Sequence, residues 1–288
     1  MMKTIAIIGA GGQMGKWLSN YFEKNGFDVT GFDTENKIPT NIKKAESLIS
    51  AILNKEYVLL STPTKKTPEI IRLIAKEMRR ESYLIDITSQ KSKTSTALGK
   101  IPAKVCPICI HPMFGPGAKG VKNQNIISIP IKDGKKELTV AKNLFPEAHF
   151  VTIDSNEHDK KIAIILGLTH LINIAFANIL AKDEKILLTE KMAGTTFKAQ
   201  KIIAESILTE SPELIETIIS NPEIRKVAEE FWKDIGRLLT SAQDGNSDDI
   251  VSYINSNREK LEEHVDLTKS YKQLTKMVNT IEKLNEKN

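Results

Sequence analysis

The sequence TIAIIGAGGQMG, residues 4–15, decides the fold of this chain, because an apolar strand runs directly into a glycine-rich turn. The pattern predicts an amphipathic helix over residues 13–24 and a second strand over residues 28–32 that ends on Asp33. Glycines let a backbone approach a pyrophosphate closely, and the start of the following helix offers unpaired N–H groups and the positive end of a dipole. This order of elements predicts a dinucleotide-binding unit.

The glycine turn also indicates which dinucleotide is bound. Gly9, Gly12 and Gly15 give Gly-x-x-Gly-x-x-Gly, one residue longer than the usual fingerprint, and a tight turn without a ligand could show the same glycines. Asp33 ends the second strand, where a carboxylate accepts hydrogen bonds from both ribose hydroxyls and repels a 2′-phosphate. We therefore expect NAD as the cofactor, and Lys37 is the one nearby cation that would favour NADP.

Composition places the chain among globular proteins. Its 288 residues are 40% hydrophobic and 27% charged, and the net charge of +5 comes from interspersed residues rather than a basic block, so we expect no nucleic-acid partner. The first strand begins without a secretory signal, which favours a cytoplasmic location. Cys106 and Cys109 have no second ligand pair, so we interpret them as buried apolar residues and expect no metal site.

Glycine and proline divide the chain near residue 154. Eleven of the 15 glycines and nine of the 11 prolines precede that point. Before it, short apolar strands alternate with helical patterns, and after it the pattern is helical. The sequence predicts an α/β, Rossmann-type dinucleotide-binding domain over residues 1–153 and an all-α domain over residues 154–288 that serves substrate binding and dimerisation. We expect strands near 4–8, 28–32, 57–61, 83–87, 105–111, 126–130 and 149–153, and helices over 13–24, 42–54, 66–79, 92–99 and 135–145.

One stretch, residues 162–180, carries no charged side chain and is long enough to span a bilayer. Its histidine and asparagine residues are costly in lipid, and charged residues flank it on both sides. We therefore predict a helix buried in protein, partly between two subunits, and hence a homodimer rather than a membrane protein.

Three predicted strand ends carry polar groups where an open parallel sheet binds its ligands. The first is Ser61-Thr62-Pro63, the second is residues 86–91 with Ser89, and the third begins at His111. His111 is either a general base or a turn histidine, and Ser89 is either a functional hydroxyl or a helix cap. The candidate cofactor-binding residues are Gly9, Gly12, Gln13, Met14, Gly15, Asp33, Ser61, Thr62 and Pro63.

The motifs GAGGQMG (9–15), DITSQK (86–91) and especially HPMFGP (111–116) resemble the prephenate dehydrogenase family of tyrosine biosynthesis. The resemblance covers the dinucleotide domain and, more loosely, the helical domain to about residue 245. It implies an NAD-dependent oxidative decarboxylation of prephenate, a small-molecule substrate, to 4-hydroxyphenylpyruvate.

The resemblance also implies roles for individual residues. His111 would accept the proton of the ring hydroxyl, Ser89 would orient that histidine, and His170 would bind substrate. Where the family places an arginine that binds the substrate's side-chain carboxylate, this chain has Ser206. Lys198, two helical turns earlier, is the candidate replacement.

Other functions fit part of this pattern. Arogenate differs from prephenate by an amine in place of a ketone and is the alternative substrate. A β-hydroxyacid or imine dehydrogenase would share the layout and use Lys191 or Lys198 as its catalytic group. A non-catalytic nucleotide-binding dimerisation protein would need neither residue.

Overall fold

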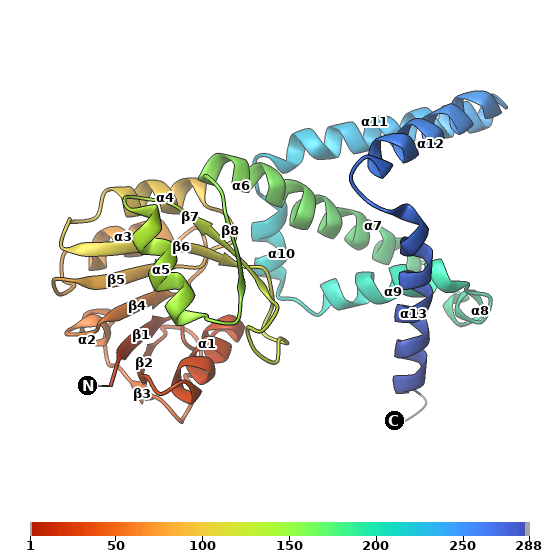
Figure 1. Cartoon of the computed structure of the whole chain (residues 1–288). Coiled ribbons are helices and arrows are strands. Elements are labelled where there is room, and N and C mark those ends of the chain that lie inside the picture. The colour runs from red at the N-terminus through yellow and green to blue at the C-terminus, as the bar shows by residue number, and fades with distance from the viewer. Residues whose placement is uncertain (1, 286–288) are drawn as a thin grey trace. The chain divides into compact units, whose positions relative to one another are not determined.

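The computed structural model describes residues 2–285 and divides the chain into two compact units, Met1–Ile162 and Ala163–Asn288 (Figure 1). The elements of the first unit are β1 (Thr4–Ile8), α1 (Gln13–Lys24), β2 (Asp28–Phe32), β3 (Lys43–Lys44), α2 (Leu48–Ile52), β4 (Tyr57–Leu60), α3 (Thr67–Ile74), β5 (Ser82–Asp86), α4 (Ser92–Gly99), β6 (Val105–Pro112), β7 (Asn125–Ile129), α5 (Gly134–Leu144), β8 (His149–Thr152) and α6 (Ser155–Ile162). Those of the second are the π-helical segment η1 (Ala163–Leu168), α7 (Thr169–Ala181), α8 (Ile186–Lys191), α9 (Thr195–Leu208), α10 (Pro212–Ile219), α11 (Ile224–Gln243), α12 (Ser247–Glu262) and α13 (Leu267–Asn285).

The first unit is built on one sheet with the strand order β3-β2-β1-β4-β5-β6-β7-β8. Every neighbouring pair is parallel except β6 and β7. The predicted α/β domain followed by a helical region is therefore confirmed. The single helix predicted over 42–54 is wrong, because Lys43–Lys44 pairs with β2 as a short edge strand and the helix that follows is only α2. Two residues are too few to carry a strand signal in the sequence.

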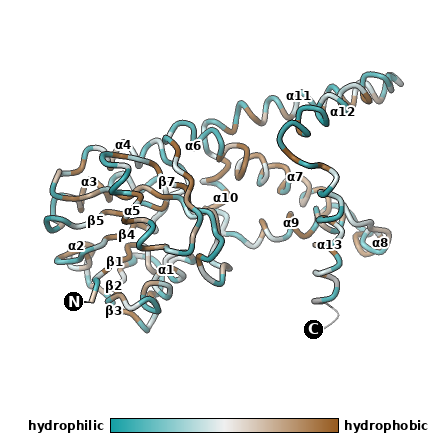
Figure 2. Tube along the Cα trace, viewed as in Figure 1, coloured by the Kyte–Doolittle hydropathy of each residue, from teal (hydrophilic) through white to brown (hydrophobic). Residues whose placement is uncertain are grey.

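Apolar residues point to both faces of the sheet, as expected for buried parallel strands. Val58, Leu60 and Leu84 pack on the face covered by α2, α3 and α4, whereas Leu59 and Ile85 pack on the face covered by α1 and α5. All five side chains are fully buried. In Figure 2 the central strands are correspondingly hydrophobic. Helices therefore cover both faces of the sheet.

The strand ends that carry the predicted polar groups meet at one edge of this sheet. β1, β2, β4, β5 and β6 all run in the same direction, and the register aligns Leu60 with Asp86 and Asp86 with Cys109. His111 lies two residues beyond Cys109 on β6. The carboxyl ends of these strands therefore form the edge at which an open α/β sheet binds ligands.

In the second unit, η1 packs closely against α11. A side chain at Gly167 would overlap Ile224, so this approach requires glycine. Among the described residues, Ile164 and Ile165 of η1 and Ile179 of α7 are each about half exposed or more. The stretch Ser155–Ala181 is also long and apolar enough to cross a membrane, with 33% of its most apolar window buried.

The predicted domain boundary, 153/154, lies just before α6, whereas the two compact units divide at the end of that helix. Because α6 continues through η1 into α7, one helical run joins the units. We keep the boundary between the functional domains as a prediction.

Candidate active site

The glycine turn between β1 and α1 is shaped to receive an anion. Gly9 has a left-handed backbone (φ +86°), and a side chain on Gly15 would overlap the Gly9 carbonyl, so both positions need glycine. α1 begins at Gln13 and Met14 with no side-chain cap and no acidic residue in its first turn. The unpaired N–H groups of that turn fit the pyrophosphate of a dinucleotide.

Asp33 lies at the end of β2 and fixes the glycine turn. Its Oδ2 accepts a hydrogen bond from Gly11 N at 3.0 Å, while its Oδ1 accepts from Glu35 N at 2.9 Å and from Asn36 N at 2.8 Å. The carboxylate therefore lies beside the turn, as recognition of a ribose requires. Lys37 is exposed nearby.

The Ser61-Thr62-Pro63 segment leaves β4 beside the same turn. Ser61 N donates to the Ile8 carbonyl at 2.8 Å, and a side chain on Gly9 would meet the Ser61 carbonyl. Thr62 and Thr67 hydroxyls lie 2.8 Å apart, while Pro63 is exposed. The structure thus brings all the predicted cofactor-binding residues to one end of the sheet.

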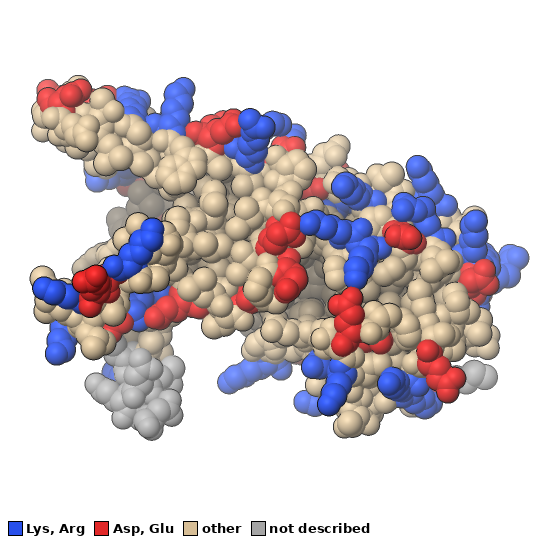
Figure 3. Space-filling model, turned by 180° about the vertical axis from the view of Figure 1, so that it is seen from behind, with Lys and Arg blue, Asp and Glu red and all other residues tan. Residues whose placement is uncertain are grey.

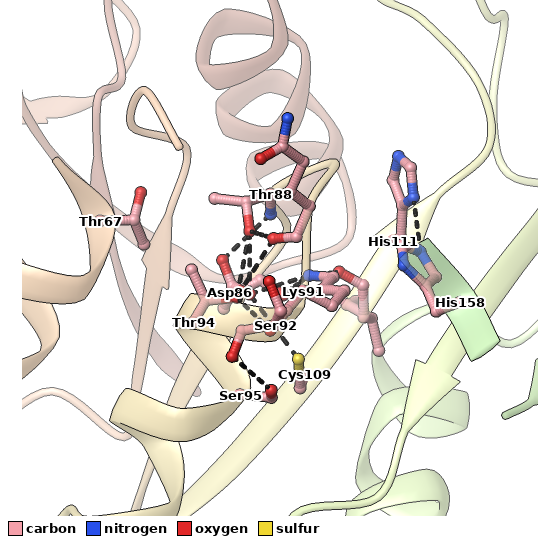
Figure 4. A network of polar contacts seen from close by, with 12 residues as sticks. Thr67, Asp86, Thr88, Lys91, Ser92, Thr94, Ser95, Cys109, His111 and His158 are labelled. Carbon is pink, nitrogen blue, oxygen red and sulfur yellow. Dashed lines mark hydrogen bonds and ion pairs between the residues drawn. The ribbon is translucent and has the colours of Figure 1, made fainter. Parts of the chain in front are cut away.

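Lys91, in the turn between β5 and α4, is a fully buried cation. Its Nζ donates to Asp86 Oδ2 at 2.8 Å, to the Ile110 carbonyl at 2.6 Å and to the Asp86 carbonyl at 3.3 Å. A buried ammonium is tolerated only when it is paired and hydrogen-bonded in this way. The three bonds join the end of β5 to β6 one residue before His111 (Figure 4).

His111 ends β6 and is hydrogen-bonded to a second histidine. Its Nδ1 lies 3.0 Å from Nε2 of His158 on α6, and both rings are buried. His158 Nδ1 lies 2.9 Å from Asp159 Oδ1. Asp159 also accepts the backbone N–H groups of Lys91 and Ser92, each at 2.9 Å, and so caps the start of α4 from outside. These residues, all from the first unit, form a continuous polar chain.

The surroundings of His111 set its protonation state. Burial lowers the pKa of His111 well below 6.5, and the charge of Lys91 and the neighbouring His158 lower it further, while Asp159 opposes this shift. Burial alone would raise the pKa of Asp159, but the hydrogen bonds from His158, Lys91 and Ser92 outweigh it and lower that pKa. His111 is therefore neutral at pH 7, the state in which an imidazole accepts a proton.

Ser89 lies partly buried in the turn after β5, and the His111 ring is bonded through Nδ1 to His158. The motif after His111 is anchored elsewhere, since Phe114 packs edge-on against Trp17 of α1 and Trp17 Nε1 donates to the Ala118 carbonyl at 2.6 Å. The role predicted for Ser89 stays a prediction.

In the second unit, His170 lies in a polar pair of its own. Its Nδ1 is 2.7 Å from the Leu166 carbonyl and its Nε2 is 3.3 Å from Glu210 Oε2. Burial alone would lower the pKa of His170, but the bonds to Glu210 and Leu166 outweigh it and raise that pKa. The two acceptors favour an imidazolium, because each requires an N–H donor.

The other predicted residues of the second unit lie along α8 and α9. Lys198 is partly buried, and Lys191 is exposed at the end of α8. Ser206 is exposed and donates its hydroxyl to the Ile203 carbonyl within its own helix at 2.8 Å. Ser206 therefore cannot take the place of an anion-binding arginine.

Sequence reasoning missed four residues of these networks. Lys91 appears in the quoted motif without a role, and His158, Asp159 and Glu210 do not appear as candidates. An adjacent His-Asp pair at the start of the helix after the last strand is a signal that could have drawn attention to His158 and Asp159. Nothing in the spacing indicates that His170 meets Glu210, forty residues away.

Basic and acidic side chains are intermixed over the face shown in Figure 3, as expected from the interspersed sequence. Among residues 2–285, no cluster of three or more histidine, cysteine or acidic side chains could hold a metal ion.

Comparison with known families matches both parts of the chain. The model described as prephenate dehydrogenase, nucleotide-binding domain, matches residues 23–162, and the one described as prephenate dehydrogenase, dimerization domain, matches residues 154–256. The two matches together span residues 23–256. The glycine turn precedes the matched range, so its assignment depends on its own geometry.

Two relatives and one solved structure illustrate what this chain is similar to. A "probable arogenate/prephenate dehydrogenase" of Methanocaldococcus jannaschii is 30% identical over 79% of this chain, and a "T-protein" of Enterobacter agglomerans is 23% identical over 88%. The chain spans only 54% and 66% of the length of these relatives. A crystal structure of prephenate dehydrogenase from A. aeolicus, in complex with hydroxyphenyl propionate and NAD+, has a TM-score of 0.69 at 20% identity and covers 91% of this chain and 98% of its own.

The buried His111 predicts a loss of stability in acid. The unfolded chain takes up a proton near pH 6.5, whereas folded His111 does so only at lower pH, so the free energy of unfolding falls as pH drops below 6.5. Each such group contributes at most about 1.4 kcal/mol per pH unit. Urea unfolding between pH 7 and 5 should show that the free energy of unfolding falls less steeply for His111→Gln than for the natural protein.

The matched control is His149→Gln, which removes an exposed histidine from β8. It should leave the decline unchanged. Equal declines for the natural protein and His111→Gln would contradict a depressed pKa of His111.

Proposed function

This chain belongs to the prephenate dehydrogenase family, and we propose that it oxidises and decarboxylates prephenate to 4-hydroxyphenylpyruvate with NAD. The observation that carries the proposal is the buried, neutral His111 at the carboxyl end of β6, on the sheet edge that also holds the glycine turn. A base is needed there because oxidation of a hydroxyl releases its proton.

The first unit has the features that NAD requires. The open N-terminus of α1 suits the pyrophosphate, Asp33 suits the ribose hydroxyls, and its charge disfavours a 2′-phosphate. The cofactor, when bound, supplies the acceptor for the hydride that leaves the ring carbon. The Ser61-Thr62-Pro63 segment borders the glycine turn, where it would flank the cofactor.

His111 acts as general base in this proposal. Its Nδ1 is bonded to His158, and its Nε2 makes no hydrogen bond among the described residues. Every fully buried side-chain nitrogen or oxygen in the described part of the chain has a hydrogen-bond partner, so Nε2 is not fully buried. Nε2 is therefore the ring atom that a substrate would meet. It takes the hydroxyl proton as the ketone forms. When the ring carboxylate leaves as CO2, the electrons of that bond make the ring aromatic, and His111 returns the proton to the phenol oxygen. Such assistance is worth about 10²–10⁴-fold in rate.

The second unit supplies candidates for binding the substrate's side chain. Lys198 and a protonated His170 are the cations that a side-chain carboxylate would meet in place of the arginine missing at Ser206. Arogenate is the second candidate substrate, because the Glu210 carboxylate beside His170 would favour its ammonium group over the ketone of prephenate. A β-hydroxyacid dehydrogenase that uses Lys191 gains no support, since Lys191 is exposed.

We also propose a homodimer formed through the helical unit. Ile164, Ile165 and Ile179 leave one side of the η1–α7 helix uncovered, and the matched model for this region is described as a dimerization domain. A second copy of the same helix would bury that surface symmetrically. We propose that this dimer works in the cytoplasm without a membrane or nucleic-acid partner.

The first prediction from this function concerns His111→Asn. Asparagine can hydrogen-bond the ring hydroxyl but cannot accept its proton near neutral pH. We expect kcat with prephenate and NAD to fall by at least 10²-fold while KM for NAD stays within about twofold, the pattern of an interaction made mainly in the transition state. A variant that keeps more than a tenth of the natural kcat would make His111 a structural turn residue.

The second prediction concerns the dimer. Sedimentation at micromolar concentration should give twice the chain mass, and Ile164→Glu together with Ile179→Glu should shift the protein toward monomer because two charges cannot be buried unpaired. Val251→Glu, on exposed α12, serves as the control for an added charge elsewhere. A natural protein that sediments as a fully active monomer would rule the dimer out.

A further inference from the structure

His111 belongs to a chain of hydrogen bonds in which the donor and the acceptor of each bond can be assigned. It runs from Asp159 through His158 to His111, with separations of 2.9 and 3.0 Å, and Figure 4 shows the two imidazole rings joined through one nitrogen each. All three residues belong to the first unit. None of these contacts uses His111 Nε2, the atom proposed to take the substrate proton.

The donor and acceptor of the first bond are set by Asp159. An ionised carboxylate only accepts hydrogen bonds, and the lowered pKa of Asp159 keeps it ionised. His158 Nδ1 must therefore carry the proton and donate it to Asp159 Oδ1. The carboxylate is already stabilised by the two N–H groups at the start of α4, so it does not need a charged His158.

A neutral His158 with its proton on Nδ1 has only a lone pair on Nε2. The 3.0 Å contact to His111 is then a hydrogen bond only if His111 Nδ1 donates. That leaves His111 Nε2 without a proton. From this geometry we propose that Asp159 and His158 are positioning residues that hold His111 in the tautomer able to act as a base; the catalytic meaning of this tautomer rests on the proposed function.

The opposite tautomer shows why this matters. If His158 carried protons on both nitrogens, its Nε2–H would point at His111 Nδ1, and a neutral His111 would carry its proton on Nε2. His111 could then only donate to a substrate hydroxyl. Lys91, whose charge lies near His111, and Asp159 are the other charged groups that act on the His111 ring. The tautomer of His111 therefore decides whether its Nε2 can act as a base.

The same chain accommodates the charge that forms during reaction. When His111 accepts a proton on Nε2 it becomes an imidazolium that still donates Nδ1–H to His158. His158 in turn still donates Nδ1–H to Asp159, so each hydrogen bond is kept and a carboxylate lies at the end of the chain. The proton accepted from substrate stays on Nε2, from which it can return.

The direct test is the protonation state of each histidine in the free protein. With ¹⁵N-labelled histidine at pH 8, the NMR shifts of the ring nitrogens and their couplings to the ring protons identify the tautomer. The chain has five histidines, which single substitutions can assign. We expect both His111 and His158 to be protonated on Nδ1 alone. His111 protonated on Nε2, or an average of both tautomers, would overturn the proposal whether or not the protein turns over prephenate.

Two substitutions at His158 add a kinetic test. In His158→Gln the amide oxygen can accept from His111 Nδ1 and the amide N–H can donate to Asp159, so we expect the His111 tautomer to persist and kcat to fall by less than tenfold. His158→Met offers the His111 Nδ1–H only a thioether sulfur, which is a weak acceptor, and has no N–H to donate to Asp159. We expect mixed tautomers and a loss in kcat of about 10²-fold, with KM for NAD and for prephenate within about twofold.

His149→Gln, at an exposed site on β8, is the control and should leave tautomer and kcat unchanged. Natural kcat in His158→Met would contradict a positioning role. Equal losses in His158→Gln and His158→Met, with NAD binding weakened to the same degree, would indicate a purely structural role and would also overturn the proposal. If both variants fail to fold, the tautomer measured in the natural protein decides the matter alone.

Discussion

A buried lysine holds the edge of this sheet together. The Lys91 ammonium is bonded to Asp86 at the end of β5 and to the Ile110 carbonyl of β6, while its backbone N–H is bonded to Asp159 of α6. Removing one partner of a buried ion pair typically costs about 3–5 kcal/mol because an unpaired charge is left behind. The position of His111, one residue beyond Ile110, therefore depends on this cation.

The same cation contributes to the chemistry of the site. Together with burial, its positive charge disfavours a second positive charge on His111 and so keeps that ring neutral. The negative charge of Asp159 raises the pKa of His111. The Asp159 carboxylate is hydrogen-bonded to His158, however, and His158 is the residue bonded to His111. One buried charge thus fixes the strand ends and keeps the adjacent histidine ready to accept a proton.

Much of the first unit could be predicted from sequence, because its signals are local. The glycine turn, the apolar strands and Asp33 follow each other within thirty-three residues, and the structure places them as the pattern indicated. His111 was recognisable because it opens a distinctive motif. β3 was not, since its two residues form a strand only through their pairing with β2.

Contacts between distant residues could not be predicted in this way. Lys91 and Asp159 are 68 positions apart, and His111 and His158 are 47 apart, so no spacing rule connects them. His158 is also a hydrogen-bond partner of His111 that the HPMFGP motif did not indicate, because it comes from a separate helix. The pairing of His170 with Glu210 likewise appears only in the folded chain, and it places an acidic group beside His170 that the sequence did not indicate.

We propose that this sheet edge oxidises a cyclohexadienol with loss of CO2. The most direct measurement is the initial rate of reduced-cofactor formation at 340 nm with prephenate, arogenate and a panel of 3-hydroxyacids, each offered with NAD and with NADP. We predict turnover with prephenate, arogenate or both, faster with NAD than with NADP. Turnover confined to 3-hydroxyacids, or binding of NAD without turnover of any substrate, would contradict it.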